Sequence, residues 1–371
     1  MNKLFAVLVL FTLLFSLQAQ ERNDGYIYTG TFTSEGAEGI YLLSFSKTSG
    51  NIVLRQVFKG IDNPSFIKIT PDKKFLFAVT RPETAIEESG GFVQSWLIKD
   101  NGQLQFINKQ VSHGADPCHI DVSADGKYVA IATYGGGTVS LYEVEQDGSL
   151  KPAASTIVNE GSGPNLSRQK APHAHSIKFH PDGNTLFSAD LGTDQLNILN
   201  LKGNQLKPAR QSHIKLAPGA GPRHFTFHPN GKTIYVINEL NSTITVVEKK
   251  GSKWNTVQTI STLPVDFTGT NYCADIHISP DGRFVYGSNR GHNSIAVFRN
   301  DEGTNQLEWI TSVSTQGDWP RNFTFSPDGQ FLLVANQRSN NITVFRMDEN
   351  GTPIFTGNEV KIPAPVCLEF Q

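Results

Sequence analysis

The sequence predicts an all-β fold, a seven-bladed β-propeller in which the C-terminal strand joins the N-terminal strands to close the last blade. Two observations predict this fold: a strand–turn–strand unit that recurs along the chain, and chain ends that each carry part of one unit. A tight turn marks the unit, because Pro fixes φ while Asn, Asp and Gly tolerate turn conformations. The turn occurs as Pro71-Asp72-Lys73, Ala124-Asp125-Gly126, Pro181-Asp182-Gly183, Pro229-Asn230-Gly231, Pro280-Asp281-Gly282 and Pro327-Asp328-Gly329.

Strand-like segments flank every turn. Alternating apolar residues precede the turns, at Ile67/Ile69, Ile120/Val122, Ile177/Phe179, Phe225/Phe227, Ile276/Ile278 and Phe323/Phe325. Two further strand-like segments follow each turn, for example residues 331–336 and 341–346. A period of about 50 residues with about four short strands is typical of a propeller blade.

The two ends of the chain complete one another. Residues 365–370 match the first strand of the preceding unit, residues 320–325, but no turn follows them. Residues 26–31 and 39–45 match later strands of a unit, and no first strand precedes them. Pairing of the ends would close the ring and remove exposed sheet edges. Residues 21–371 are therefore predicted to form one seven-bladed domain, with residues 135–137 and 159–170 as blade loops.

Residues 1–20 have a different character. Lys3 precedes an apolar segment at 4–17, and Leu17-Gln18-Ala19 resembles a cleavage site. This pattern predicts a secretory signal peptide. The alternative is an uncleaved anchor helix, for which the apolar segment is short. The protein is therefore expected to be exported, either periplasmic or secreted, without membrane association after cleavage.

Composition narrows the classes of function. The 371 residues include 32 Lys and Arg against 34 Asp and Glu, a formal net charge of −2. Such a chain lacks the basic footprint of a protein that binds nucleic acid or an anionic membrane. Cys118, Cys273 and Cys367 fall in non-adjacent blades, so no disulfide is predicted. We expect a monomer without a cofactor.

Alignment of the blades by their turns brings polar residues into three columns. Six residues before the turn stand Ser65, Cys118, His175, Arg223, Ala274, Arg321 and, by alignment, Val366. The next column contains Phe66, His119, Ser176, His224, Asp275, Asn322 and Cys367. Ten residues after the turn stand Arg81, Tyr134, Leu191, Glu239, Arg290 and Gln337, with Thr31 from the N-terminal half-blade. Because the strands of a hairpin are antiparallel, these positions are predicted to gather at one mouth of the channel.

The charged and imidazole side chains of these columns are the predicted site. They are Arg223, Arg290, Arg321, His119, His175, His224, Glu239 and Asp275. Like charges in a partly desolvated funnel are costly unless a ligand or a network offsets them. Since arginine forks match carboxylate and phosphate, the expected ligand is anionic or rich in oxygen. The alternative is that these residues tie neighbouring blades together, and for His119 a core role is equally open. His180 and His228, beside the turns, are assigned a structural role.

Other kinds of chemistry have weaker support. His173 and His175 could form a metal pair, but the partner acids are spread around the ring, so no metal site is predicted. Residues 135–137 are three glycines without the Lys and following helix of a phosphate loop. The chain has no Gly-x-Ser-x-Gly motif, which argues against a serine hydrolase.

Several motifs, in chain order, resemble one known family. They are Tyr28-Thr-Gly-Thr31, Pro172-His-Ala-His175, Gly221-Pro-Arg-His224, Asn238-Glu239, Asn289-Arg290-Gly291 and the segment Pro365-Val-Cys-Leu-Glu-Phe370. They resemble the seven-bladed lactonases, which include cycloisomerase-type 6-phosphogluconolactonases and fungal 3-carboxy-cis,cis-muconate lactonising enzymes. The resemblance covers nearly all of residues 21–371. It implies a catalytic His, Glu and two Arg, at His175, Glu239, Arg223 and Arg290.

The resemblance implies a carboxylic ester hydrolase that acts on a sugar lactone. Glu239 or His175 would deprotonate the attacking water, and the arginines would stabilise the oxyanion. The substrate would be bound by Arg321, His224, His173, His119 and Asp275. Export favours an unphosphorylated lactone, because 6-phosphogluconolactone is made inside the cell.

Two other functions stay open at this point. The same site could close a muconate-like diacid, as a lactonising cycloisomerase. The domain could also be a non-enzymatic propeller that binds carbohydrate or protein at the cell envelope, since a fold alone does not decide function. The ring of Arg, His and Glu argues against a purely binding role. The expected partner is therefore a small lactone or organic acid.

Overall fold

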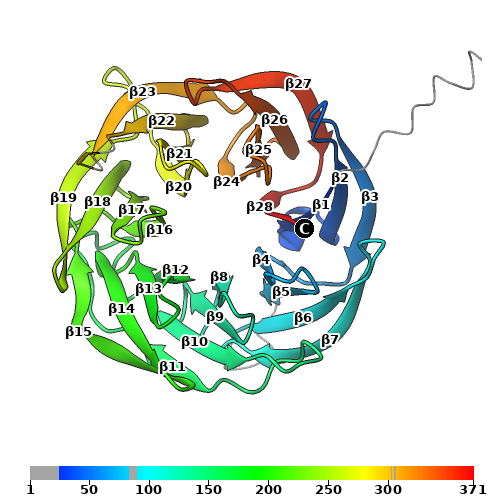
Figure 1. Ribbon diagram of the computed structural model, residues 1–371, viewed down its shortest axis with the longest axis horizontal. Coiled ribbons are helices and arrows are strands. Elements are labelled where there is room, and N and C mark those ends of the chain that lie inside the picture. The colour runs from blue at the N-terminus through cyan, green and yellow to red at the C-terminus, as the bar shows by residue number, and fades with distance from the viewer. Residues whose placement is uncertain (1–24, 83–89, 302, 305) are drawn as a thin grey trace, which may run out of the picture.

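The computed structural model describes residues 25–82, 90–301, 303–304 and 306–371. These residues form seven four-stranded antiparallel sheets, arranged as blades around a central channel (Figure 1). The prediction of an all-β, seven-bladed propeller is confirmed. The predicted signal peptide falls on residues 1–20, which lie outside the described residues.

We number the blades in chain order from the N-terminus. Blade 1 contains β28 (Pro365–Phe370), β1 (Gly25–Thr31), β2 (Gly39–Phe45) and β3 (Ile52–Lys59). Blade 2 contains β4 (Phe66–Ile69), β5 (Phe75–Thr80), β6 (Phe92–Ile98) and β7 (Leu104–Val111). Blade 3 contains β8 (Pro117–Val122), β9 (Tyr128–Thr133), β10 (Thr138–Glu143) and β11 (Ser155–Val158). Blade 4 contains β12 (Ala174–Phe179), β13 (Thr185–Asp190), β14 (Gln195–Lys202) and β15 (Gln205–Lys215).

The remaining blades follow the same plan. Blade 5 contains β16 (Pro222–Phe227), β17 (Thr233–Asn238), β18 (Thr243–Lys250) and β19 (Lys253–Ser261). Blade 6 contains β20 (Tyr272–Ile278), β21 (Phe284–Arg290), β22 (Ser294–Asn300) and β23 (Leu307–Ser314). Blade 7 contains β24 (Pro320–Phe325), β25 (Phe331–Asn336), β26 (Asn341–Met347) and β27 (Pro353–Lys361). The first strand named for each blade is the innermost one (Figure 1).

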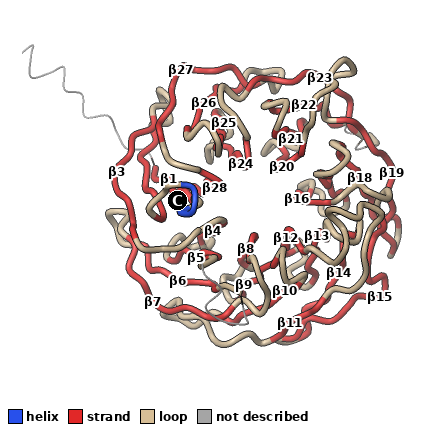
Figure 2. Tube along the Cα trace, turned by 180° about the vertical axis from the view of Figure 1, so that it is seen from behind, coloured by secondary structure: helices blue, strands red, loops and turns tan. Residues whose placement is uncertain are grey.

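The chain ends close the ring as predicted. Strand β28 pairs antiparallel with β1, with Ile27 opposite Phe370 and Thr29 opposite Leu368. A short 3-10 helix, η1 (Thr33–Glu35), follows β1 and lies beside this junction (Figure 2). The Phe32 backbone N–H, just before η1, donates to the Ala364 carbonyl at 3.2 Å. The N-terminal loop is thereby held against the inner strand of its own blade.

The hairpin turns use the residues that marked them in the sequence. The hydroxyls of Thr70, Ser123, Ser279 and Ser326 each donate to the Asp two residues later, at 2.5–2.7 Å. His180 replaces this hydroxyl in blade 4, and its Nε2 lies 2.9 Å from the Gly231 carbonyl of blade 5. This contact between blades agrees with the structural role assigned to His180.

The apolar core lies between neighbouring blades. Phe187 of blade 4 packs edge-on against Phe225 and Trp254 of blade 5, within one buried cluster. A similar cluster joins Phe45 of blade 1 to Phe331 of blade 7. Aromatic pairs of this kind add to the free energy gained by burial. Each inner strand is therefore held by packing on both sides of its blade.

A β-bulge lies near the start of most inner strands. The pairing register shifts at Cys118, His175, Arg223 and Arg321, which each lie between two paired residues of the same strand. A bulge places two residues opposite one and re-aims a side chain. Adjacent residues of these strands can therefore both face the channel, although a regular strand would point them to opposite faces.

Two further findings concern membrane-spanning helices and the state of the cysteines. Within the described ranges, the fold contains no helix with the length and apolarity needed to cross a membrane. Cys118, Cys273 and Cys367 are free thiols on the inner strands of blades 3, 6 and 1.

Candidate active site

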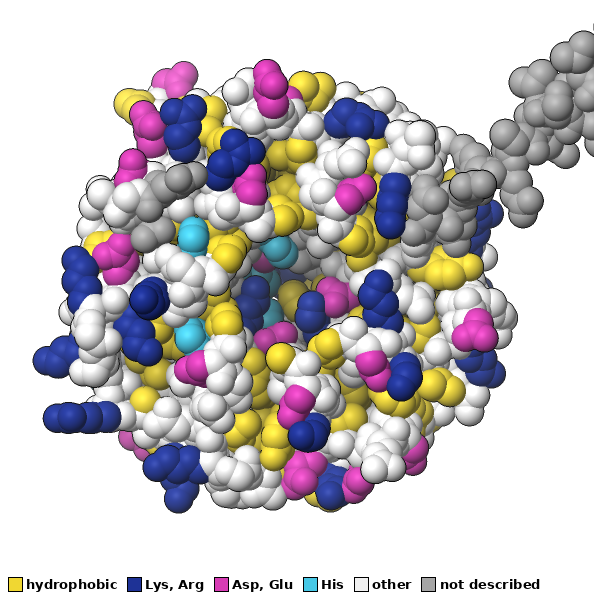
Figure 3. All heavy atoms as spheres, in the orientation of Figure 1, with side chains coloured by type: hydrophobic (Ala, Val, Ile, Leu, Met, Phe, Trp, Pro, Cys, Tyr) yellow, Lys and Arg dark blue, Asp and Glu magenta, His cyan; other side chains and the backbone are white. Residues whose placement is uncertain are grey.

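The inner strands line two cavities along the central channel. One lies at the mouth, where the first residues of these strands gather, and its lining includes Phe66, Arg223, His224 and Arg321. The other, of about 330 Å³, lies toward the turns and is lined by residues that include Lys178. Phe66 and His224 line both cavities and so separate them. Basic, acidic and imidazole side chains surround the opening at the centre of the ring (Figure 3).

Glu239 lies at the centre of the charge network at the mouth. It follows β17, and its backbone N–H donates to the Gly221 carbonyl at 2.7 Å. Gly221 has a φ of +63°, and a Cβ there would lie 2.4 Å from the Leu240 side chain. This position therefore favours glycine, and the tight junction sets Glu239 beside Arg223, as the hairpin in the sequence predicts.

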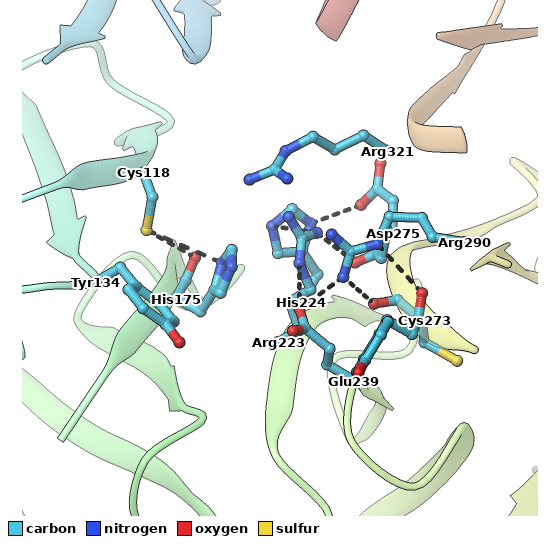
Figure 4. Close-up of polar contacts among 12 residues, drawn as sticks. Cys118, Tyr134, His175, Arg223, His224, Glu239, Cys273, Asp275, Arg290 and Arg321 are labelled. Atoms are coloured by element: carbon cyan, nitrogen blue, oxygen red, sulfur yellow. Dashed lines mark hydrogen bonds and ion pairs between the residues drawn. The ribbon is translucent and has the colours of Figure 1, made fainter. Parts of the chain in front are cut away.

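Three guanidiniums surround the Glu239 carboxylate. Arg168 donates to Oε1 at 2.6 Å. Arg290 donates to Oε2 at 2.7 Å, and Figure 4 shows this arginine beside Glu239. Arg223 Nε lies 3.1 Å from Oε2 as an ion pair, at an angle that does not make it a hydrogen bond. Burial alone would raise the pKa of Glu239, but Arg290, Arg223 and Arg168 outweigh burial and lower this pKa to about 2.

Arg223 is held by contacts on both sides. Its Nη1 donates to the Ala274 carbonyl at 2.6 Å and lies 3.3 Å from His224 Nε2. Burial and the neighbouring Arg290 lower the pKa of Arg223 to about 10, so it is still protonated at neutral pH. Its charge is therefore buried and only partly compensated.

A second chain of contacts runs from Arg223 toward the turn-side cavity. His224 Nδ1 lies 2.7 Å from Asp275 Oδ1, and the other Asp275 oxygen lies 3.1 Å from His277 Nε2. Asn322 of blade 7 also donates to that oxygen at 2.5 Å. Burial lowers the pKa of His224 to about 3, so this imidazole is neutral. A neutral ring that accepts from Arg223 must donate its Nδ1 hydrogen to Asp275.

His175 lies on the opposite side of the mouth, facing the arginines (Figure 4). Its Nδ1 lies 3.9 Å from Cys118 Sγ, and its ring meets Tyr134 edge-on with centroids 5.4 Å apart. No described residue makes a hydrogen bond to its Nε2. Burial, followed by the charge of Arg223, lowers the pKa of His175 well below its usual range. The imidazole is therefore neutral.

The remaining predicted histidines occupy different places. His119 packs against Phe66 with the ring centroids 4.3 Å apart and the planes tilted by 30°, and it lines the turn-side cavity. His173 stacks on Tyr134 at 4.3 Å, and its Nδ1 lies 2.8 Å from the Tyr134 carbonyl. His119 is therefore one layer below the mouth, and His173 lies beside the mouth on the tyrosine.

The structure thus divides the predicted residues into two layers. Arg223, Glu239, His175, Arg290 and Arg321 gather at the mouth, as expected. His119, His224 and Asp275 line the turn-side cavity, although His224 also reaches the mouth. These three residues stand one position after the column of Arg223 and Arg321. The bulge in each inner strand, which the alignment of the blades does not reveal, sets the direction of their side chains.

Two arginines of the mouth were not selected from the sequence. Arg168 lies in the loop at 159–170, which has no fixed register to the blade turns, so no column contains it. Arg81 stands in the same column as Glu239 and Arg290, and that position was the available signal. Its Nη1 lies 3.4 Å from Asp116 Oδ1. Among the described residues, no group of three or more His, Cys, Asp or Glu is placed to hold a metal ion.

Comparison with known proteins agrees with this geometry. Residues 26–370 match the family model described as a lactonase, 7-bladed beta-propeller. The chain belongs to this family. A 6-phosphogluconolactonase of Bacillus subtilis is 35% identical over 346 residues, which cover 92% of this chain and 97% of that protein. A 6-phosphogluconolactonase of Formosa agariphila is 36% identical over 303 residues, covering 80% of this chain and 85% of the relative.

A solved structure extends the comparison beyond sequence. The periplasmic gluconolactonase of Pseudomonas aeruginosa superposes on this lactonase-family chain with a TM-score of 0.87 and 31% identity. The match covers 93% of this chain and 98% of that structure. The resemblance identified from the sequence motifs is thus confirmed at the level of the family.

Proposed function

We propose that the protein hydrolyses a sugar lactone at the mouth of its channel. The relatives named as gluconolactonases and 6-phosphogluconolactonases support this class of substrate. The observation that carries the proposal is the pairing of a free neutral imidazole, His175, with a carboxylate that three guanidiniums already occupy. In this arrangement His175 can act as the base, while the arginines held by Glu239 can stabilise negative charge.

His175 is the proposed general base. The Glu239 carboxylate is already engaged by three guanidiniums, which occupy the oxygens that would have to accept a proton from water. The neutral imidazole accepts the proton from a water molecule as the oxygen attacks the lactone carbonyl. The ring C–O bond of the lactone then breaks, and the proton returns to the leaving alkoxide to give the hydroxy acid.

The arginines at Glu239 are the proposed oxyanion site. Arg223 and Arg290 are oriented by one carboxylate, so their positions need little reorganisation when negative charge forms on the carbonyl oxygen. Glu239 is therefore a positioning residue, and it lowers the cost of gathering like charges in a buried place.

The test is proton release by the purified protein in a pH-stat, with glucono-δ-lactone as substrate and spontaneous hydrolysis subtracted. His175→Gln is expected to lower kcat by about 10²- to 10⁴-fold, the usual contribution of a general base. His213→Gln, on the outer strand β15, is the matched control and should keep the wild-type rate. Unchanged hydrolysis by a folded His175→Gln protein would overturn the role of His175. Consumption of muconate absorbance without lactone hydrolysis would indicate a lactonising cycloisomerase instead.

We also propose that residues 1–20 are a cleaved signal peptide and that the protein is exported. The support is the Lys3 and apolar pattern, together with the periplasmic location in the name of the Pseudomonas relative. Cell fractionation and N-terminal sequencing test this proposal. A cytoplasmic protein that retains residues 1–20 would contradict it.

A further inference from the structure

The turn-side cavity has no part in the proposed reaction. Its volume of about 330 Å³ falls within the range of about 300–1,000 Å³ that is usual for small-molecule sites. Phe66 and His224 separate it from the mouth, because both side chains line both cavities. The turn-side cavity can therefore hold a ligand of its own.

A ring of polar side chains surrounds this cavity. Each inner strand contributes the residue that stands two positions after the column of His224. In order from blade 1 to blade 7, these residues are Glu369, Lys68, Asp121, Lys178, Thr226, His277 and Thr324. All of them except Thr226 line the cavity. Acids and lysines thus alternate in blades 1 to 4, and hydroxyl and imidazole groups follow in blades 5 to 7.

The carboxylates of the cavity already have partners within the fold. Glu369 Oε1 forms an ion pair with Lys68 Nζ at 2.8 Å. Asp121 Oδ2 accepts the Phe179 backbone N–H at 2.9 Å, which ties blade 3 to blade 4. Asp275, one layer nearer the mouth, is bonded to two imidazoles and one amide. These acids therefore contribute to the contacts between neighbouring blades.

Lys178 differs from these groups, because its ammonium makes no hydrogen bond or ion pair with any described residue. Its side chain is only partly exposed. Burial lowers the pKa of Lys178, although the charges of Asp121 and Asp275 act in the opposite direction. An ammonium has three N–H donors, and leaving them without acceptors in a partly buried place is costly. The missing acceptor must come from solvent or from a ligand in the cavity.

Groups across the channel from Lys178 define the rest of such a ligand. Blades 7 and 1 face blade 4 across the ring (Figure 1). The Thr324 hydroxyl and Glu369 Oε2 line the cavity from those blades, and neither is hydrogen-bonded to another residue that the structure describes. A hydroxyl can bond to either of them. A ligand that satisfies both sides therefore carries an acid group at one end and hydroxyl groups at the other.

We propose that the turn-side cavity is a second ligand site, which binds a small hydroxylated carboxylate. The acid group accepts hydrogen bonds from Lys178, and the hydroxyl groups bond to Thr324 and Glu369. Hydrogen bonds between an ammonium and a carboxylate are charge-assisted and hence strong. The site is separate from the mouth, and it does not depend on the proposed lactonase function.

Titration with D-gluconate, followed by NMR of protein labelled with ¹⁵N in its histidine rings, tests the proposal. His119 and His277 line the turn-side cavity and not the mouth, whereas His175 lies at the mouth. The histidine signals are assigned with single His→Gln variants. Gluconate should shift the His119 and His277 signals to saturation, whatever the response of His175. If these two signals do not move, the site is overturned.

Two variants and a matched control identify the groups that bind. Lys178→Met should raise the Kd obtained from these signals by about 10- to 100-fold, as expected for the loss of a charge-assisted contact. Thr324→Val should raise it by about 2- to 10-fold, as expected for a neutral hydrogen bond. Lys202→Met removes the same charge from an exposed position of blade 4 and should keep the wild-type Kd. An unchanged Kd in both cavity variants would overturn the assignment.

Two further probes test the chemical class of the ligand. Glucitol has the hydroxyl groups of gluconate without the acid, and acetate has the acid without the hydroxyl groups. Each should bind at least about tenfold more weakly than gluconate, because each lacks one set of contacts. Glucitol that binds as tightly as gluconate would overturn the role of Lys178, and acetate that does so would overturn the hydroxyl contacts. Because the readout is binding and not turnover, failure of the proposed lactonase function would leave this test intact.

Discussion

Glu239 illustrates how a single residue controls the charge state of the mouth. Its carboxylate is 5% exposed, and burial alone would favour the neutral acid. The three guanidiniums reverse this preference, so the group is ionised at every physiological pH. Replacing it would leave several cations close together and without their shared partner.

The linkage between Glu239 and stability can be measured. Its pKa is about 2 in the folded protein and about 4.5 in an unfolded chain, so ionised Glu239 stabilises the fold above pH 4.5. This contribution is lost as the pH falls from about 4.5 toward about 2. The unfolding free energy of the wild type minus that of Glu239→Gln should therefore shrink by roughly 2 kcal/mol between pH 7 and pH 3. Urea denaturation of both proteins at each pH provides the measurement, and a constant difference would contradict the assignment.

The lowered pKa of His175 predicts an unusual pH profile. A base with an ordinary pKa of 6.5 would lose about 30-fold in activity between pH 8 and pH 5, because it becomes protonated. The lowered pKa keeps His175 neutral further into the acid range, so kcat/KM for glucono-δ-lactone should fall much less than 30-fold between pH 8 and pH 5. An acid limb with a midpoint near pH 6.5 in the wild type would contradict this expectation.

Arg321→Gln gives the matching comparison. Arg321 is one of the charges that lower the pKa of His175. Its removal should raise that pKa and move the acid limb of the profile to higher pH. An acid limb that does not move would show that Arg321 does not act on the base.

Individual site residues could be predicted where they stand at a fixed distance from a turn. Arg223 and Arg321 lie six residues before a turn, and Glu239 and Arg290 lie ten after one, so antiparallel pairing brings them together. The depth of each side chain could not be predicted in this way. His119 and His224 follow bulged positions and Asp275 lies within one, and no alternation pattern in the sequence shows that a bulge directs them toward the second cavity.

The loop at 159–170, which is not part of the repeated blade unit, contributes Arg168 to the site. Gln169 is fully buried, and its amide donates to the Leu191 carbonyl and to Asp194 Oδ1, both at 2.8 Å. Asp194 also accepts the Gly221 backbone N–H at 2.8 Å. The same anchor therefore holds the loop that carries Arg168 and the segment that leads to Arg223.

Loss of this anchor should loosen the loop before it unfolds the blade. Gln169→Ala leaves buried polar groups without partners, at a cost of about 1–3 kcal/mol. Limited proteolysis should cut faster within residues 159–170, and kcat/KM should fall because Arg168 is no longer held at Glu239. Ser162→Ala, at an exposed position of the same loop, is the control and should behave as the wild type. Equal proteolysis of Gln169→Ala and wild type would show that the loop is held by other contacts.

The sequence predicted the strands of the blades but not the conformation of this loop. Recurrent Pro-Asp-Gly turns and the complementary chain ends located all seven blades, because turn chemistry and apolar alternation are local. The position of Arg168 depends on how a long segment folds back over the mouth, and this depends on the buried anchor at Gln169. Neither residue repeats in other blades, so comparison between blades could not reveal them.

For the whole molecule, closure of the ring depends on one strand pairing. Strand β28 supplies the innermost strand of blade 1, and it buries Val366, Cys367 and Leu368 against its neighbours. A chain that ends at Ala364 should expose the edges of β1 and both adjacent blades. We expect it to aggregate or to lose the cooperative thermal transition of the full-length protein, as followed by circular dichroism. Removal of Gln371 alone is the control, and a truncated chain that melts like the wild type would contradict the role of β28.

The same pairing fixes an order of events during synthesis. Ile27 can pair with Phe370 only after residue 370 has left the ribosome. A nascent chain can therefore form and pack blades before it can close the ring of blades. Until then the edge of β1 that faces the channel stays unpaired, and the mouth lacks the wall made by Val366. Synthesis of β28 therefore decides when this domain becomes both compact and able to bind.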